Sequence, residues 1–146
     1  MRDSGLVAAQ LALLGLLAGL GTPGLLRGAW PPDALGLAAA GVALGLWALS
    51  ANRPGNFNIR PVPHPRGQLV ESGPYRWIRH PMYTSLMLAG LAVARGTGGP
   101  WSWLALLALV GVLLAKARLE EALMRQRHPG YAAYAARTGR FLPFVG

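Results

Sequence analysis

The chain contains no cysteine among its 146 residues, and acidic residues are scarce. Without cysteine the protein has no disulfide, no thiolate nucleophile and no metal site built on thiolates. Only five Asp and Glu residues stand against 14 Lys and Arg residues, which gives a formal net charge of +9. The three histidines are far apart and each precedes a proline, a pattern that matches no recognised set of metal ligands. We therefore expect no metal site, and the excess of basic charge needs an explanation of its own.

Charged side chains are also missing from two long apolar stretches, residues 6–26 and 34–49. A helix rises 1.5 Å per residue, so about 20 apolar residues cross a hydrocarbon core of about 30 Å. Each stretch is therefore predicted to be a transmembrane helix. We interpret the first as a retained span and not as a secretory signal, because Arg2 is the only basic residue before it, Asp3 offsets that charge and no clear A-x-A site follows.

Two shorter apolar runs follow, residues 82–94 and 101–115. As helices they would be roughly 20 and 22 Å long, short of a full hydrocarbon core, and we expect them to form a short helical hairpin. Residues 116–127 contain no Pro or Gly, so the second hairpin helix should continue into the cytosol. Pro129 suits the first turn of a short cytosolic C-terminal helix. The predicted fold is an all-α integral membrane protein with about four transmembrane helices.

The basic residues fall almost entirely on one side of these four segments. Arg27 and Arg95 stand apart from the other twelve of the 14, which lie before the first segment, between the second and third, and after the fourth: Arg2, Arg53, Arg60, Arg66, Arg76, Arg79, Lys116, Arg118, Arg125, Arg127, Arg137 and Arg140. Basic loops stay on the cytoplasmic side of a membrane, so both termini are expected in the cytoplasm. The charge then reflects topology and attraction to anionic headgroups, and nucleic acid is not an expected partner.

A glycine-rich segment, G-L-G-T-P-G at residues 19–24, formally matches the dinucleotide-binding fingerprint. That motif works only between a strand and a helix, whereas this segment lies inside a predicted span. We interpret it as close packing of small residues, like the small-xxx-small pairs Gly15 with Gly19 and Gly41 with Gly45.

The most informative motifs come after the second span. The block G-x-Y-x-x-x-R-H-P-x-Y at residues 73–83 opens the hairpin, and an E-E pair, Glu120 and Glu121, follows it. The blocks G-Y-x-x-Y and R-F-x-P-F end the chain within residues 130–144. In this order, over residues 52–144, they resemble the isoprenylcysteine carboxyl methyltransferase and phospholipid methyltransferase family, in particular its bacterial integral membrane members.

This resemblance implies a single membrane methyltransferase domain over residues 1–146. Residues 1–50 would supply two N-terminal spans, and residues 51–146 the cofactor-binding catalytic part. The implied cofactor is S-adenosylmethionine, and the implied acceptor is lipophilic or amphiphilic, such as a prenylcysteine-type carboxylate or a phospholipid amine. The implied partner is the lipid bilayer, and the implied location is a bacterial inner membrane, with the reaction at its cytoplasmic interface.

The same resemblance assigns the site residues. Those expected to contact the cofactor are Tyr75, Arg79, His80, Pro81, Tyr83, Glu120, Glu121, Tyr131 and Tyr134. Catalytic roles fall to His80, Glu121 and Arg137, with Arg140 as a further basic residue for an anionic head, and no metal is assigned.

The chemistry of these side chains agrees with that assignment. Pro81 suits the start of a helix, so His80 and the free amides of the first turn can receive a carboxylate. Tyr83 lies one turn further on. A nearby carboxylate suits a ribose diol or a sulfonium, and we place Glu121 slightly ahead of Glu120.

Simpler explanations stay open for each residue. His80 could only cap its helix, and the tyrosines could form an aromatic belt at the headgroups. Glu121 has basic residues at i−3 and i+4, which is typical of an exposed helix. Two other functions also stay open, a small membrane transporter and a non-catalytic lipid-binding protein. A transporter normally keeps an ionisable group at membrane depth, and none is evident in the cores of the apolar segments.

Overall fold

The computed structural model describes residues 2–52 and 69–145. Within them lie five α-helices and a short 3-10 turn: α1 (Arg2–Leu26), α2 (Pro32–Ala51), η1 (Gly73–Arg76), α3 (Pro81–Thr97), α4 (Pro100–Arg127) and α5 (Tyr131–Arg137). The described residues contain no strand beyond two isolated bridges. The all-α prediction is confirmed. Most of the proline-rich loop, with His64, falls outside the described residues.

Three of these helices are long and apolar enough to cross a bilayer: Ser4–Leu26 within α1, Pro32–Ala51 and Pro100–Arg127. The chain is an integral membrane protein. The first hairpin helix is longer than its apolar run of residues 82–94, because α3 continues through Arg95 to Thr97 and ends where Gly98 adopts a left-handed φ of 66°. With 17 residues, α3 is not among these three helices. The predicted extension of the fourth helix to Arg127 is confirmed.

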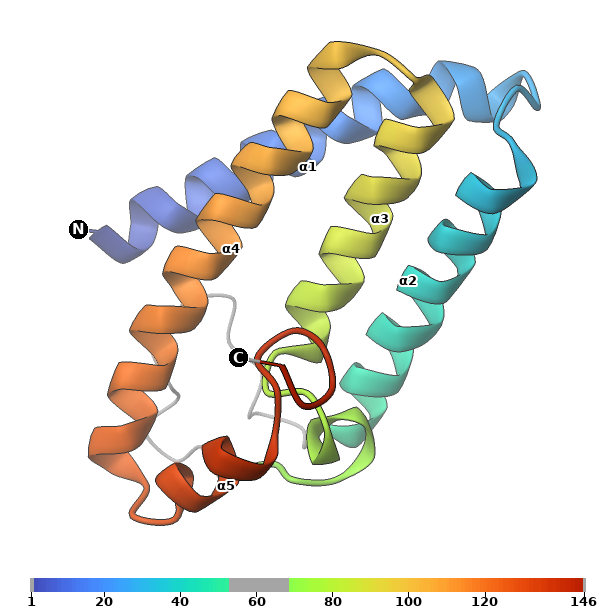
Figure 1. The fold of residues 1–146 in the computed structure, drawn as a ribbon. Helices are drawn as coiled ribbons and strands as arrows, with labels where there is room; N and C mark the ends of the chain where they lie inside the picture. Colours follow the sequence, from blue (N-terminus) through green and yellow to red (C-terminus); the bar gives the residue numbers. More distant parts are fainter. Residues whose placement is uncertain (1, 53–68, 146) are drawn as a thin grey trace.

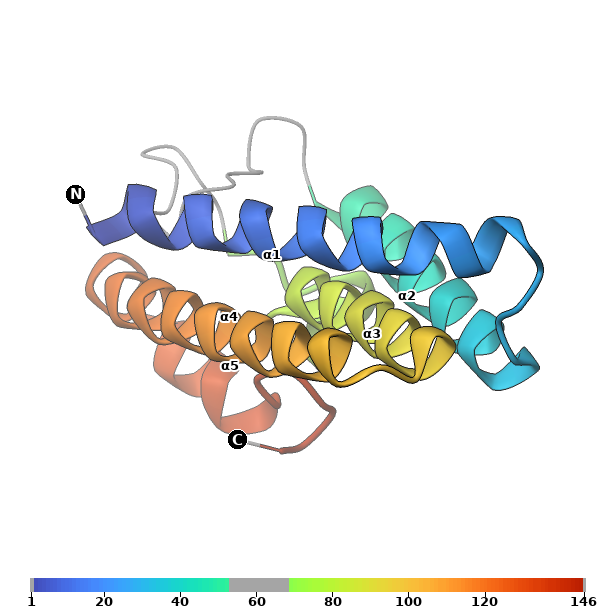
Figure 2. The ribbon, with the colours of Figure 1, turned by 90° about the horizontal axis from the view of Figure 1, so that it is seen from above.

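Helix α3 lies at the centre of the bundle and packs against α1, α2 and α4. Seen from above, α1 lies over α3 and α4, and α5 lies on the other side of α4 (Figure 2). A cluster of buried leucines joins α1 to α4 through Leu17, Leu109 and Leu113. The site described below is therefore held by helices that pack on one central helix.

Small residues pack as predicted in α2 and in part of α1, where an added Cβ at Gly21 or Gly24 would lie 3.0 or 3.2 Å from the Trp30 ring. An added Cβ at Gly41 would lie 3.0 Å from the Ser85 carbonyl oxygen, and one at Gly45 would lie 3.2 Å from the Ser85 Oγ. This pair therefore lets α2 approach α3 closely. Gly15 and Gly19 have nothing within 4 Å among the described residues, so the packing predicted for them is wrong.

The connection between α1 and α2 and the connection between α3 and α4 lie at the same end of the bundle, as Figure 1 shows. Trp30, between α1 and α2, packs over Gly96 near the end of α3 so tightly that an added Cβ there would lie 2.6 Å from the indole ring. Arg95 Nε lies 2.7 Å from Asp33 Oδ2, although both side chains are exposed. These contacts lock α2 to α3 at that end.

At the other end, the C-terminal segment folds back onto the start of α3 (Figure 1). The Arg79 amide donates to the Gly139 carbonyl at 2.8 Å, and the His80 amide donates to the Arg140 carbonyl at 3.0 Å. The Gly139 amide donates in return to the Trp77 carbonyl at 2.9 Å. This short parallel bridge places α5 and the residues after it beside the basic and aromatic residues of the 73–83 block.

Candidate functional site

The site begins at the N-terminus of α3, where Pro81 is the first helical residue and His80 is the N-cap. The prediction of a helix start at Pro81 is confirmed. Proline fits there because the first-turn amides have no partner inside the helix. The His80 side chain gives no capping hydrogen bond and is buried, so its imidazole is directed to other groups. The simpler explanation of His80 as a side-chain cap does not hold.

Glu121 of α4 is the centre of a cationic cluster, and it is only 1% exposed. Its Oε1 accepts hydrogen bonds from Arg79 Nε at 2.9 Å and Arg140 Nε at 3.0 Å, and its Oε2 accepts one from Arg140 Nη2 at 3.0 Å. His80 Nε2 lies 3.3 Å from Oε1, and Arg125 Nη2 lies 3.5 Å from Oε2. A carboxylate buried among cations in this way differs from the exposed helix pairing that the sequence also allowed.

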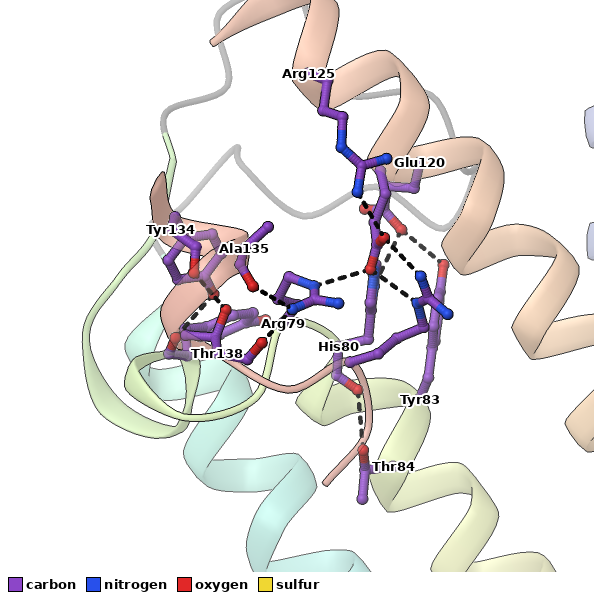
Figure 3. Close-up of polar contacts among 12 residues, drawn as sticks. Arg79, His80, Tyr83, Thr84, Glu120, Arg125, Tyr134, Ala135 and Thr138 are labelled. Atoms are coloured by element: carbon purple, nitrogen blue, oxygen red, sulfur yellow. Dashed lines mark hydrogen bonds and ion pairs between the residues drawn. The ribbon is translucent and has the colours of Figure 1, made fainter. Parts of the chain in front are cut away.

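Arg79 extends this cluster toward α5. Its Nη1 donates to the Ala135 carbonyl at 2.9 Å and also to the Thr138 carbonyl. Figure 3 shows Arg79 between the carbonyl groups of Ala135 and Thr138 and the residues around His80. The hydrogen bonds to Glu121 raise the pKa of Arg140, so that guanidinium stays charged. Arg79 and Arg140 therefore fasten the C-terminal segment to α3 and α4 through one carboxylate.

Glu120 has a different environment from its neighbour. Its side chain is 32% exposed, and its Oε2 accepts a hydrogen bond from the Tyr83 hydroxyl at 3.1 Å. His80 Nδ1 lies 3.6 Å from the same oxygen, and the His80 and Tyr83 rings are stacked with centroids 5.2 Å apart (Figure 3). His80 thus lies between two carboxylates, one buried and one partly open to solvent.

Two tyrosines of α5 form an aromatic surface next to this cluster, and a third tyrosine, Tyr75, contacts one of them through its backbone. Tyr131 and Tyr134 share a buried face of α5, with ring centroids 5.8 Å apart, and the Tyr134 hydroxyl donates to the Tyr75 carbonyl at 2.8 Å. Burial raises the pKa of Tyr75 to about 12, and it also raises the pKa values of Tyr131 and Tyr134. All three hydroxyls are therefore neutral donors at physiological pH.

The structure brings together most of the residues that the sequence singled out. The residues that lie together at this end of the bundle are Tyr75, Arg79, His80, Pro81, Tyr83, Glu120, Glu121, Tyr131 and Tyr134. Arg137 lies outside the cluster, because its exposed guanidinium pairs with Glu71 at 2.9 Å and lies over the Tyr134 ring. It is at the rim, beside the aromatic surface.

Two parts of the cluster were missed in the sequence. Arg140 was named only as a residue for an anionic head, whereas it makes two hydrogen bonds to Glu121; its place in the R-F-x-P-F tail was the available signal. Lys116 was counted with the cytosolic part of α4, yet it is buried and donates to Gln10 of α1. A single lysine at the end of an apolar run, opposite a single glutamine in the first span, was the signal for that contact.

Comparison with known proteins locates the same residues in a family. The family model described as phospholipid methyltransferase matches residues 33–129, which include α2, α3 and α4 with His80 and both glutamates. An uncharacterized protein of Schizosaccharomyces pombe is 35% identical over 78 residues, which is 49% of this chain and 23% of the yeast protein. The chain thus spans less than a quarter of that relative. Since the family match covers well over half of its length, the chain belongs to the phospholipid methyltransferase family.

Proposed function

We propose that this chain is an S-adenosylmethionine-dependent methyltransferase whose site lies at the cytoplasmic end of the bundle. The observation that carries the proposal is the convergence of His80, Tyr83 and Glu120, from α3 and α4, at the end of a membrane bundle and within the family-matched region. A polar cofactor must arrive from water and a lipophilic acceptor from the bilayer. A site at the membrane surface serves both.

The donors and acceptors of the cluster fit this cofactor. Its carboxylate suits the helix start at His80 and Pro81, where the first-turn amides carry a partial positive charge. Its ribose diol and its cationic groups suit the partly exposed carboxylate of Glu120.

The two glutamates receive different roles in this proposal. Both oxygens of Glu121 already accept hydrogen bonds from arginines, and the side chain is buried. Glu120 is partly exposed. Of the contacts described above for its carboxylate, one is a hydrogen bond, and the Tyr83 hydroxyl donates it. We therefore assign the cofactor contact to Glu120, and to Glu121 the task of holding Arg79 and Arg140 in place.

When bound, the cofactor would supply a methyl group on a sulfonium: the acceptor would bond to the methyl carbon in line with the carbon–sulfur bond, which breaks and releases the neutral thioether. The protein holds the reactants in position and keeps water out. A carboxylate acceptor needs no base, whereas an amine acceptor must lose a proton. We assign this role to His80, because its Nδ1 lies 3.6 Å from the partly exposed Glu120 carboxylate, to which it can pass the proton on.

The acceptor in this proposal is amphiphilic, either a phospholipid amine or a prenylcysteine-type carboxylate. Exposed cations stand at the rim of the site: Arg76 lies over the Trp77 ring, and Arg137 lies over the Tyr134 ring. Such cations can hold an anionic head while the acceptor's chain stays in hydrocarbon.

Calorimetric titration of the protein in lipid nanodiscs with S-adenosylmethionine and with its demethylated product tests the proposal. The wild type should bind both. His80→Ala and Glu120→Gln should each weaken binding at least tenfold, about 1.4 kcal/mol. His128→Ala is the matched control, because His128 also precedes a proline but lies at the C-cap of α4, and it should bind like the wild type. A wild type that binds neither compound would overturn the proposal and favour a non-catalytic lipid-binding protein.

A further inference from the structure

A buried polar contact links α1 to the site from the membrane side. Lys116 of α4 is 1% exposed and Gln10 of α1 is 5% exposed, and the Lys116 ammonium donates to the Gln10 side-chain oxygen. Removing a lysine ammonium and an amide from water costs free energy unless both are satisfied by partners. The retention of both groups in this apolar surrounding therefore calls for a reason beyond packing.

Lys116 is connected to Glu120 through the Tyr83 side chain. Its ammonium lies over the Tyr83 ring, 5.3 Å from the centroid, and the Tyr83 hydroxyl donates to Glu120 at 3.1 Å. Glu120 is also one helical turn beyond Lys116 on α4, close enough for the two charges to attract each other. The Tyr83 ring is in turn stacked on His80. One cation thus borders the ring and the carboxylate on which the proposed cofactor site depends.

We propose that Lys116 is a positioning residue, held by Gln10, which fixes Tyr83 and Glu120 in the arrangement that the site requires. The part concerning ligand binding rests on the function proposed above. Helix α1 ends before residue 33, where the family match begins, so this support comes from outside the matched region. In this view α1 contributes to the geometry of the site as well as to membrane anchoring.

The chemistry explains why a lysine is required. An ammonium attracts the face of an aromatic ring and a nearby carboxylate at the same time. Lys116→Met keeps an unbranched side chain of similar length but removes both attractions. Gln10→Leu removes the oxygen that accepts the ammonium hydrogen bond, whereas Gln10→Glu keeps an acceptor there.

Fluorine NMR on the cofactor-free protein tests the positioning itself. The four tyrosines are replaced by 3-fluorotyrosine, and the Tyr83 signal is assigned as the one missing in Tyr83→Phe. Lys116→Met and Gln10→Leu should each move the Tyr83 signal and leave those of Tyr131 and Tyr134 in place. Leu107→Ala, on an exposed position of α4, is the control and should move none of them. A Tyr83 signal that stays in place in both variants would overturn the inference.

Cofactor affinity gives the second readout. Lys116→Met should weaken S-adenosylmethionine binding at least fivefold, Gln10→Leu should weaken it in the same direction, and Gln10→Glu should restore it. Equal affinity in Lys116→Met and the wild type would contradict the inference even if the Tyr83 signal moved. If Lys116→Met does not fold, the two Gln10 variants carry the test. If the wild type binds no cofactor, the proposed function fails, and the fluorine spectra alone decide on the positioning.

Discussion

Glu120 and Glu121 are adjacent on α4 but have different environments. Glu121 holds three parts of the chain together, because it accepts hydrogen bonds from Arg79 before α3 and from Arg140 in the C-terminal segment. Glu120, one residue earlier, faces Tyr83 and is partly exposed. A helix turns about 100° per residue, so the two side chains point in different directions, although both reach His80. The E-E pair thus separates a buried, structural carboxylate from one that is partly open to solvent.

Glu121→Gln should destabilise the protein by roughly 3 kcal/mol, because it leaves the buried Arg79 guanidinium without its carboxylate. Glu120→Gln should cost less than about 1 kcal/mol, since its carboxylate is partly solvated. Chemical unfolding in detergent, followed by circular dichroism, measures both. Equal losses in the two variants would contradict the division of roles.

At the scale of the helices, local signals in the sequence accounted for most of the structure. Uncharged apolar length predicted α1 and α2, Pro81 predicted the start of α3, and the absence of Pro and Gly after Lys116 predicted the continuation of α4. Each of these signals acts within one segment. They could be recognised without knowing which segments meet.

The contacts between distant segments could not be predicted in the same way. The burial of Glu121 depends on Arg79 and Arg140, which reach it only because the C-terminal segment returns to α3. The burial of Lys116 depends on Gln10, 106 residues away in the sequence. Charge and spacing alone made Glu121 and Lys116 look like exposed residues of a cytosolic helix, and the family resemblance pointed to the first but not to the second.

The contact between Trp30 and α3 gives a prediction about how these helices are joined. Gly96→Ala should destabilise the protein by about 1–3 kcal/mol, because its Cβ would lie 2.6 Å from the indole, and that ring is itself packed against Gly21 and Gly24. Gly15→Ala is the matched control: its Cβ meets nothing within 4 Å among the described residues, so it should be neutral or slightly stabilising. Thermal unfolding of both variants measures the difference. A Gly96→Ala protein as stable as Gly15→Ala would contradict the tight contact.

The whole molecule has an uneven distribution of charge along its length. Arg95 and Asp33 lie paired at the end with the two short connections, whereas Arg79, Arg125 and Arg140 gather at the end that holds the site. The positive-inside rule predicts that the second end faces the cytoplasm. In this orientation the proposed site would open to the cytosol.

Reporter fusions test this orientation. Fusions after Arg27 and after Gly98 should report an external location, and a fusion after Gly146 should report a cytoplasmic one. Alkaline phosphatase activity marks the external fusions, and fluorescence of a green fluorescent protein marks the cytoplasmic one. A cytoplasmic report at Gly98 would mean that α3 and α4 do not cross the membrane as a hairpin.

The unequal lengths of α3 and α4 have a consequence for the bilayer itself. Both helices meet at Gly98 and Gly99, but α3 is about 26 Å long and α4 about 42 Å, so α3 ends well below the level that α4 reaches. A hydrocarbon core of about 30 Å is thicker than α3 is long, so His80 would lie below the core surface when Gly98 lies at the opposite surface. A lipid headgroup would then reach the level of His80 only where the bilayer next to the bundle is thinner. If the acceptor is a membrane lipid, as proposed above, its methylation should be faster in bilayers of short acyl chains than in thicker ones.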